Sequence, residues 1–395
     1  MANFKTFVRT GALAALTMVA ALQFSACSDD DSTPKIKITG TTVAEPQSGI
    51  PEKGVYVLNE GVMGTNKASI DYYSYGTGKF YLNIFPTINP DVTLGLGDTG
   101  NDIQVYNGKV YAVINGSNLV EVMNARTGKH IAAVSIPACR SIAFNGNYAY
   151  VSSYADPTDT AKVTKGSVYK VNLNTNRVEA TVRVGYQPEG IAYANGKLFV
   201  ANSGGYLYPN YDHTISVVDP DAMSVTKTID VGLNLGKVAL DAAENLYVIS
   251  TGNYMDVSSK IYVINTQTAA VSDSIDTRVS AIAAAGDNLY ILGVEYKYNG
   301  TSYVATNSYS LYNGRTKTLN TAGFITDGSE SNITMPYGIA ANPDNGEVYI
   351  GDAKDYKSPG TLFCYSKEGK LKWQATTGIL PGHIALTTTS LRGLE

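Results

Sequence analysis

PEGIAYANGKLFVANSG, residues 188–204, has the composition of two short strands joined by a tight turn. Its first strand is apolar, its turn contains Asn and Gly, and its second strand is β-branched and aromatic, which is typical of a β-hairpin. Three later stretches repeat this pattern, and they are LGKVALDAAENLYVISTG (Leu235–Gly252), VSAIAAAGDNLYILG (Val279–Gly293) and PYGIAANPDNGEVYIGD (Pro336–Asp352). The chain is therefore built from an internal repeat.

One apolar residue in the first strand of each repeat marks its position along the chain. Seven such anchors occur at spacings of 39, 49, 47, 44, 57 and 45 residues, and they are Ile103, Ile142, Ile191, Val238, Ile282, Ile339 and Ile384. A period of about 45 residues is that of a propeller blade. Each anchor before the last is followed by three more strands, which after Ile191 are LFVANS, TISVVD and SVTKTIDVG.

The two ends of the chain complement each other. The last anchor, in LPGHIALTTTS, has no strands after it, whereas the N-terminal part offers three strands without an anchor, GVYVLNEG, SIDYYSY and KFYLNIF. We therefore predict an all-β fold, a seven-bladed β-propeller of four-stranded blades over residues 55–390, with a closing blade formed from both termini. A pair of β-sandwiches is the alternative, but it does not explain the seven anchors. Residues 391–395 are left as a tail.

The first 26 residues have the pattern of an export signal. Lys5 and Arg9 precede an apolar run, Gly11–Leu22, that is short for a transmembrane helix. The following FSAC resembles a lipobox, in which Cys27 is lipidated and becomes the mature N-terminus; the alternative is an ordinary signal peptide with a chance cysteine. The acidic run SDDD, residues 28–31, resembles the surface-export signal of Bacteroidota lipoproteins, and residues 27–54 form a polar tether. This predicts a lipid-anchored protein exposed on the outer membrane.

The charge of the chain argues against one class of function, and the positions of its cysteines argue against a disulfide. The chain carries a formal net charge of −4, and signal removal takes away two basic residues and no acidic one, which leaves about −6. No basic stripe remains to neutralise phosphates, which argues against nucleic-acid binding. The repeat places Cys139 and Cys364 in blades that are not neighbours, so we expect two buried thiols and no disulfide.

The 29 tyrosines, against 9 phenylalanines and 1 tryptophan, divide into two sets. One set recurs at the same position in the second strand of every blade, where a repeated ring packs one blade against the next. This structural set is Tyr56, Tyr111, Tyr150, Phe199, Tyr247, Tyr290 and Tyr349.

The second set does not repeat and falls in the links between strands two and three. These links emerge on the face that rims the central channel, and long loops on a rigid scaffold usually carry function. Tyrosine suits binding because it offers a large stiff surface with one polar tip; the alternative is that the rings pack on neighbouring loops. The loops are SYADPTDTAKVTKG, YLYPNYDH, TGNYMDVSS, EYKYNGTSY and DAKDYKSPG. In blade two, the blade of the anchor Ile103, the corresponding link is only NGSN.

These loops and their neighbours supply the candidate ligand-binding residues. They are Arg140, Tyr154, Asp156, Tyr186, Glu189, Tyr206, Tyr208, Tyr211, Asp212, Tyr254, Tyr296, Tyr298, Asp352 and Tyr356. We predict no catalytic residue, no metal site and no cofactor, because GLGDTG (residues 95–100) lacks the strand and helix of a dinucleotide site and the three histidines are far apart in sequence. We expect His130, in an outer strand, to be simply exposed.

The pattern P-x-G-I-A…NGKLFVAN resembles the YncE-like propellers, from Val55 to Ser390. Together with the lipobox and SDDD, the opening VYVLNEGVMGTNKASIDYYSY and the ending LPGHIAL look like the surface propeller lipoproteins of Bacteroidota, which include the BtuG-type proteins. The resemblance implies capture of cobalamin (vitamin B12), as a ligand and not a cofactor, and its transfer to a TonB-dependent outer-membrane transporter.

Two other function classes stay open. The first is a surface propeller that binds glycans or proteins, since tyrosine loops serve those ligands equally well. The second is an enzyme similar to the virginiamycin lyases, which share the propeller pattern. That class requires a histidine beside an acid at the mouth, His213 or His383 near Glu189.

The signal interpretation predicts where the protein is found. Protease added to intact cells should degrade it, whereas replacement of Asp29, Asp30 and Asp31 by Ala should leave the protein anchored but protected inside the cell. Immunoblotting of treated cells measures both forms. Equal protease sensitivity of the two proteins would contradict a role for SDDD in surface display.

Overall fold

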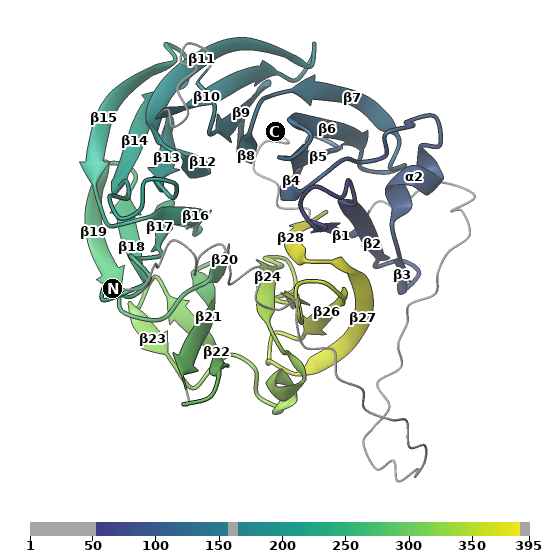
Figure 1. Cartoon of the computed structure of the whole chain (residues 1–395), viewed down its shortest axis with the longest axis vertical. Coiled ribbons are helices and arrows are strands. Elements are labelled where there is room, and N and C mark those ends of the chain that lie inside the picture. The colour runs from purple at the N-terminus through teal and green to yellow at the C-terminus, as the bar shows by residue number, and fades with distance from the viewer. Residues whose placement is uncertain (1–52, 157–164, 299, 388–395) are drawn as a thin grey trace. The chain divides into compact units, whose positions relative to one another are not determined.

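A computed structural model describes residues 53–156, 165–298 and 300–387, and these form seven four-stranded antiparallel sheets arranged as blades around a centre (Figure 1). The predicted seven-bladed all-β propeller is therefore confirmed. The predicted signal peptide, Cys27, almost all of the tether and the C-terminal tail lie outside the described residues. In the described part, no helix has both the length and the apolar character needed to cross a membrane.

The blades are numbered in order from the N-terminus, and the strands of each blade follow one another from the centre outward. Blade 1 is β28 (Pro381–Leu386), β1 (Gly54–Asn59), β2 (Ser69–Ser74) and β3 (Lys79–Tyr81). Blade 2 is β4 (Gly100–Tyr106), β5 (Lys109–Ile114), β6 (Leu119–Asn124) and β7 (His130–Ser135). Blade 3 is β8 (Cys139–Asn145), β9 (Tyr148–Ser153), β10 (Lys165–Asn172) and β11 (Arg177–Tyr186).

The other four blades follow the same order. Blade 4 is β12 (Pro188–Ala194), β13 (Lys197–Asn202), β14 (Thr214–Asp219) and β15 (Ser224–Asp230), and blade 5 is β16 (Leu235–Leu240), β17 (Asn245–Ser250), β18 (Lys260–Asn265) and β19 (Ala270–Ile275). Blade 6 is β20 (Ala281–Ala285), β21 (Asn288–Tyr298), β22 (Tyr303–Asn313) and β23 (Thr318–Asn320). Blade 7 is β24 (Pro336–Ala341), β25 (Val348–Asp352), β26 (Pro359–Tyr365) and β27 (Leu371–Ile379).

The seven anchors all lie in innermost strands, and all seven line one central cavity of about 150 Å³. Tight turns of Asn and Gly connect inner strands to second strands. Asn107 and Gly108, for example, have φ of 47° and 70°, and two consecutive residues with positive φ give the turn whose twist matches antiparallel strands.

The hydrophobic core is divided among the blade interfaces. Seven buried clusters are present in the described chain, and each combines side chains from two adjacent blades. The seven repeated aromatic residues of the second strands are all buried, at 0–8% exposure. Tyr56 in blade 1 also donates a hydrogen bond of 2.8 Å to the Ala125 carbonyl in blade 2. The predicted structural set of rings is thus confirmed as interface packing.

Closure by both termini is also confirmed. The C-terminal strand β28 pairs with β1 in an antiparallel ladder, with Val55 opposite Leu386 and Leu58 opposite His383. Figure 1 shows β28, at the yellow end of the colour range, beside the purple β1. Cys139 and Cys364 are buried free thiols, as predicted from their blades.

One predicted strand was wrong in part. KFYLNIF forms only the three-residue β3, and a short helix, α2 (Ile84–Ile88), follows it. Ile84, Phe85 and Ile88 recur at helical spacing and are buried against blades 1 and 2. Pro86 is tolerated because a proline in the first turn of a helix gives up an N–H that has no partner there.

Closure predicts the effect of a truncation. Deletion of residues 381–395 removes β28, exposes the ladder edge of β1 and opens the interface between blades 7 and 1, so the protein should aggregate or melt far below the intact chain. Deletion of residues 388–395 keeps β28 and should melt like the intact chain. Thermal denaturation with gel filtration measures both, and a monomeric 1–380 chain with an unchanged melting curve would contradict closure by β28.

Candidate binding site at the channel mouth

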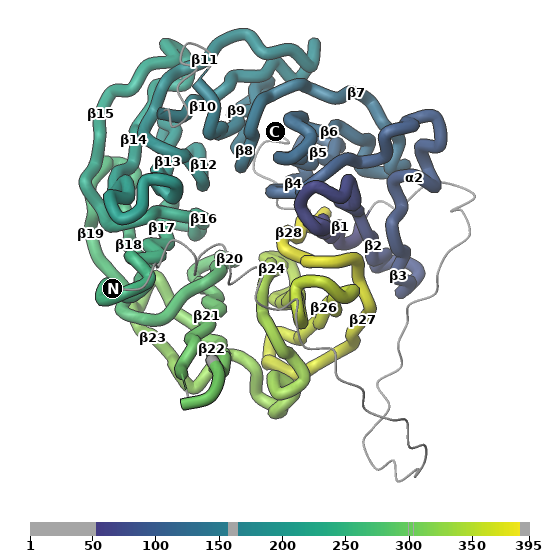
Figure 2. The backbone as a smooth tube through the Cα atoms, viewed as in Figure 1, coloured from purple at the N-terminus to yellow at the C-terminus, as the bar shows by residue number. Residues whose placement is uncertain are grey.

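Two kinds of link emerge on one side of the propeller, which we call the mouth face. They are the links between the second and third strands and the links from each outermost strand to the next blade, and they include residues 60–68, 82–99, 203–213, 251–259 and 353–358. Figure 2 traces the backbone around the ring, with β12, β16, β20, β24 and β28 bordering its centre. The opposite face has short turns such as residues 173–176.

A repeated backbone distortion shapes the mouth. The residue four positions before the anchor has a positive φ in five blades although none is glycine, namely Thr99 (57°), Ala138 (45°), Gln187 (41°), Asn234 (57°) and Leu380 (62°). A register shift follows at the start of the inner strand in every blade except blade 6. Such bulges re-aim side chains, and left-handed non-glycine residues occur where the surrounding structure imposes the strain.

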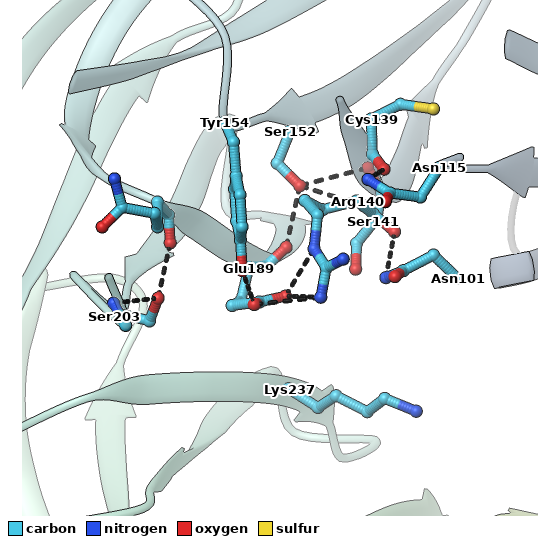
Figure 3. Close-up of polar contacts among 12 residues, drawn as sticks. Asn101, Asn115, Cys139, Arg140, Ser141, Ser152, Tyr154, Glu189, Ser203 and Lys237 are labelled. Atoms are coloured by element: carbon cyan, nitrogen blue, oxygen red, sulfur yellow. Dashed lines mark hydrogen bonds and ion pairs between the residues drawn. The ribbon is translucent and has the colours of Figure 1, made fainter. Parts of the chain in front are cut away.

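The bulges carry polar residues to the rim of the central cavity. The two positions before each anchor hold a different pair in each blade: Asn101 and Asp102, Arg140 and Ser141, Glu189 and Gly190, Gly236 and Lys237, Ser280 and Ala281, Tyr337 and Gly338, and Gly382 and His383. Side-chain hydrogen bonds hold the distorted backbone, since the buried Ser152 donates to the Glu189 carbonyl at 2.8 Å and the half-buried Asn115 donates to the Cys139 carbonyl at 2.9 Å (Figure 3).

Arg140, Tyr154 and Glu189 form one cluster on this rim. The Arg140 guanidinium donates two hydrogen bonds of 3.0 Å to the Glu189 carboxylate, and it lies 4.7 Å from the centre of the Tyr154 ring (Figure 3). The Tyr154 hydroxyl also donates to Glu189. Burial raises the pKa of Tyr154, and the negative charge of Glu189 raises it further, so the phenol stays protonated. A bidentate pair stacked on a ring is geometrically fixed.

A second cluster crosses the cavity. His383 Nε2 lies 3.0 Å from Glu60 Oε1, and the Tyr337 hydroxyl donates to Glu60 Oε2 at 3.0 Å. Lys237 reaches from blade 5 to blade 1, where its Nζ lies 3.2 Å from His383 Nδ1 and 3.4 Å from the Gly382 carbonyl. Glu60, Lys237 and Tyr337 were not among the predicted site residues. Lys237 and Tyr337 lie one and two residues before an anchor, and this position in the sequence could have identified them as site residues. Glu60 has no such position, since it lies in the link after β1.

Tyrosine rings continue the rim outward. Tyr154 packs edge-on against Tyr206 with centroids 5.5 Å apart, and Tyr211 bridges Tyr208 at 6.0 Å and Tyr254 at 6.4 Å. Tyr206 and Tyr254 nevertheless remain 71% and 70% exposed. The rings therefore pack on neighbouring loops and still present a face to solvent, and their binding of a ligand stays a prediction.

Several predicted site residues hold loops together. Asp352 is buried and accepts the backbone N–H groups of Met335 and Lys354, and Asp212 accepts those of Tyr186 and Thr214. The buried Asp156 lies 2.8 Å from Arg183. Tyr211 is only 7% exposed. Of the remaining predicted residues, Tyr296 contacts the Met335 sulfur, Tyr356 packs edge-on against Tyr337, and Tyr298 is exposed at the end of β21.

The histidines have other partners than the lyase alternative requires. His130 is exposed on the outermost strand β7, as predicted, and its Nδ1 also lies 2.6 Å from the buried Glu121 on the neighbouring strand. His213 lies 3.9 Å from Asp230, and Glu189 contacts Arg140 and Tyr154, so the His–Glu189 pair of the lyase hypothesis is not formed; His383 pairs with Glu60 instead. Within the described ranges, no three His, Cys, Asp or Glu side chains gather closely enough to hold a metal ion.

Fold and mouth together define a seven-bladed β-propeller whose long loops gather on one face. The chain belongs to the family described as "Domain of unknown function (DUF5074)", whose profile matches residues 53–372. Among curated proteins, none matches the sequence.

Solved structures agree on the fold. Hydrazine synthase from Kuenenia stuttgartiensis superimposes with a TM-score of 0.59 at 16% identity, over 73% of this chain and 89% of that one. A quinoprotein alcohol dehydrogenase-like protein from Bacteroides thetaiotaomicron also gives a TM-score of 0.59 at 16% identity, over 85% and 78% of the two chains. At these identities the likeness shows the fold alone.

Burial of His383 predicts part of the pH dependence of stability. Burial lowers the pKa of His383 and the nearby Lys237 charge lowers it further, against the opposing hydrogen bond to Glu60. Because the folded pKa lies below the unfolded value of about 6.5, the unfolded chain takes up the proton first, and stability is lost as the pH falls through 6.5 towards the folded pKa.

The melting temperature should therefore fall more between about pH 7.5 and about pH 5.5 in the intact protein than in His383→Gln, which has no imidazole to protonate there. Both proteins retain the other two histidines, so the difference between them isolates His383. Identical slopes of melting temperature against pH would contradict the lowered pKa.

Proposed function

We propose that this protein is a lipid-anchored surface propeller that captures cobalamin on the mouth face and delivers it to a TonB-dependent outer-membrane transporter. One observation carries the proposal. Of the 17 exposed large hydrophobic side chains in the described chain, 13 lie on the mouth face, and these are Val62, Met63, Leu82, Leu94, Tyr206, Tyr208, Tyr254, Met255, Val257, Tyr296, Tyr298, Val304 and Tyr356. Exposed apolar side chains gathered on one face are typical of a binding surface.

The chemistry of this face suits a broad ligand with both apolar and amide groups. A corrin ring covers a large area, and exposed rings such as Tyr206 and Tyr254 offer flat apolar contact around the cavity. The amide side chains of cobalamin need hydrogen-bond partners, and the half-buried Arg140 and Glu189 lie at the rim. Neither contact requires covalent chemistry or a ligand to cobalt, so the proposal is a binding protein rather than an enzyme.

The ligand and the cellular location rest on resemblance. The ends of the propeller resemble BtuG-type proteins, and the predicted lipobox at Cys27 with its acidic run resembles the export signal of surface lipoproteins. A bacterial lipoprotein carries several acyl chains, which hold it to the membrane stably. A protein placed there meets a scarce nutrient before the transporter does.

Capture of a protein ligand is the second candidate, and one feature favours it. Strands β21 and β22 are each 11 residues long, against 3 to 10 residues for the other described strands. The end of their hairpin extends past the inner strand β20, which pairs only as far as Leu292. It exposes Tyr296, Tyr298 and Val304. An extended ribbon with apolar side chains suits contact with another protein.

Calorimetry with cyanocobalamin tests the first proposal. The chain from Ser28 onward should bind the ligand, and the triple variant Tyr206→Ala, Tyr208→Ala, Tyr254→Ala should bind about 10- to 1000-fold more weakly, since each lost aromatic contact costs roughly 0.5–1.5 kcal/mol. The matched control replaces Val178, Val225 and Val271 by Ala. These three are exposed to a similar degree as Tyr208 but lie on outermost strands, so binding should not change.

Absence of binding heat, together with failure of the red ligand to co-elute with the protein on gel filtration, would overturn the cobalamin proposal. Equal weakening by the tyrosine and valine triple variants, with unchanged melting curves, would instead place the ligand away from the mouth face.

A further inference from the structure

Lys237 occupies an unusual position inside the ring. It lies in the inner strand β16 and lines the central cavity, where its side chain is exposed to channel water although blades surround it on all sides. Its ammonium contacts His383 Nδ1 and the Gly382 carbonyl, and it forms no ion pair with a carboxylate of the described chain. In Figure 3 no contact joins it to the Arg140–Glu189 pair.

The hydrogen bonds around His383 fix which nitrogen carries the proton. Nε2 faces the Glu60 carboxylate at 3.0 Å, and a carboxylate that already accepts from Tyr337 favours a donor there. The proton therefore sits on Nε2, and the lone pair of Nδ1 points at Lys237 Nζ, 3.2 Å away. Glu60 orients the imidazole, and the imidazole is placed to accept a proton from the lysine.

This order of groups is that of an activated nucleophile. A nucleophile, a base within hydrogen-bond reach and a third group that orients the base are the parts of a catalytic triad, here with an amine in place of a hydroxyl. Although the side chain of Lys237 lines the cavity, the surrounding blades keep most solvent away from its ammonium and so lower its pKa. The charges of Glu60, Asp102 and Glu189 oppose this shift, and the charge of Arg140 adds to it. Lysines in such surroundings supply neutral amine near neutral pH.

We propose that Lys237 binds a small uncharged aldehyde or ketone in the channel as a reversible imine. Lys237 gives a proton to His383 Nδ1, and its nitrogen adds to the carbonyl carbon to form a carbinolamine. His383 then returns the proton to the departing hydroxyl, so that water leaves and the C=N bond forms. The balance is one ammonium and one carbonyl compound giving one protonated imine and one water, with no oxidant or reductant.

The cavity sets the class of ligand. A volume of about 150 Å³ admits a carbonyl compound of only a few heavy atoms. The positive charges of Lys237 and Arg140 are matched by the nearby carboxylates, so the site has no excess positive charge to hold an acidic ligand. This site does not depend on the proposed function, because cobalamin is placed on the mouth face and the amine lies within the channel.

Reductive trapping tests the proposal. The chain from Ser28 to Glu395 is incubated with glycolaldehyde and cyanoborohydride at neutral pH, and each lysine is followed by peptide mass mapping. Lys237 should be labelled severalfold faster than Lys227, which is exposed on the outermost strand β15, since a lowered pKa raises the fraction of neutral amine at a given pH. The ratio of the Lys237 labelling rate to the Lys227 labelling rate should shrink as the pH approaches about 10.4, the ordinary lysine pKa.

Two variants distinguish activation of the Lys237 amine by His383 and Glu60 from simple accessibility of that amine to the reagent. His383→Gln and Glu60→Gln should each slow labelling of Lys237 and leave Lys227 unchanged, with melting curves confirming that the ring stays closed. Lys237→Arg keeps the charge and should lose the label. Labelling of Lys237 no faster than Lys227, or a ratio that does not change with pH, would overturn the proposal whatever the outcome with cyanocobalamin.

Discussion

Closure of the ring is the constraint on which the rest of the structure depends. The part of the chain that the structure describes has no single core, because each of its seven hydrophobic clusters is shared by two adjacent blades. Every blade is therefore stable only if it has a neighbour on each side. The β1–β28 ladder completes blade 1, and Trp373 and Tyr349 of blade 7 pack beside Val55 and Val57 to fill the last interface.

Each inner strand combines a backbone feature that maintains the fold with side chains that are free to vary. The bulge at the strand start recurs in six of the seven blades, whereas the residues that it presents differ from blade to blade. Arg140, Glu189 and Tyr337 occupy corresponding positions, and Lys237 lies one residue nearer to its anchor. A repeated distortion belongs to the scaffold, and the non-repeating side chains on it are available for recognition. The mouth can thus change its ligand without change to the interfaces between blades.

Sequence reasoning succeeded where the signal was local and repeated. The anchors, the interface rings and tyrosine loops such as YLYPNYDH follow from strand periodicity and turn residues within single blades. The predicted loop EYKYNGTSY was wrong in part, because residues 295–298 and Tyr303 extend the β21–β22 hairpin. It missed the contacts of Glu60, Lys237 and His383, because Glu60 and His383 come from opposite ends of the chain and Lys237 reaches them from blade 5 across the centre of the ring. Asp212 and Asp352 accept backbone N–H groups of their own and adjacent loops, and a carboxylate in this structural role has the same sequence context as one that faces a ligand.

The central claim is that ligands bind the mouth face, and amide hydrogen exchange with and without cyanocobalamin tests it most directly. Slower exchange confined to mouth-face loops, above all residues 203–213 and 251–259, is the result expected from the exposed tyrosines there. Unchanged exchange in these loops, or protection of the opposite-face turns such as residues 125–129 and 173–176, would contradict the account.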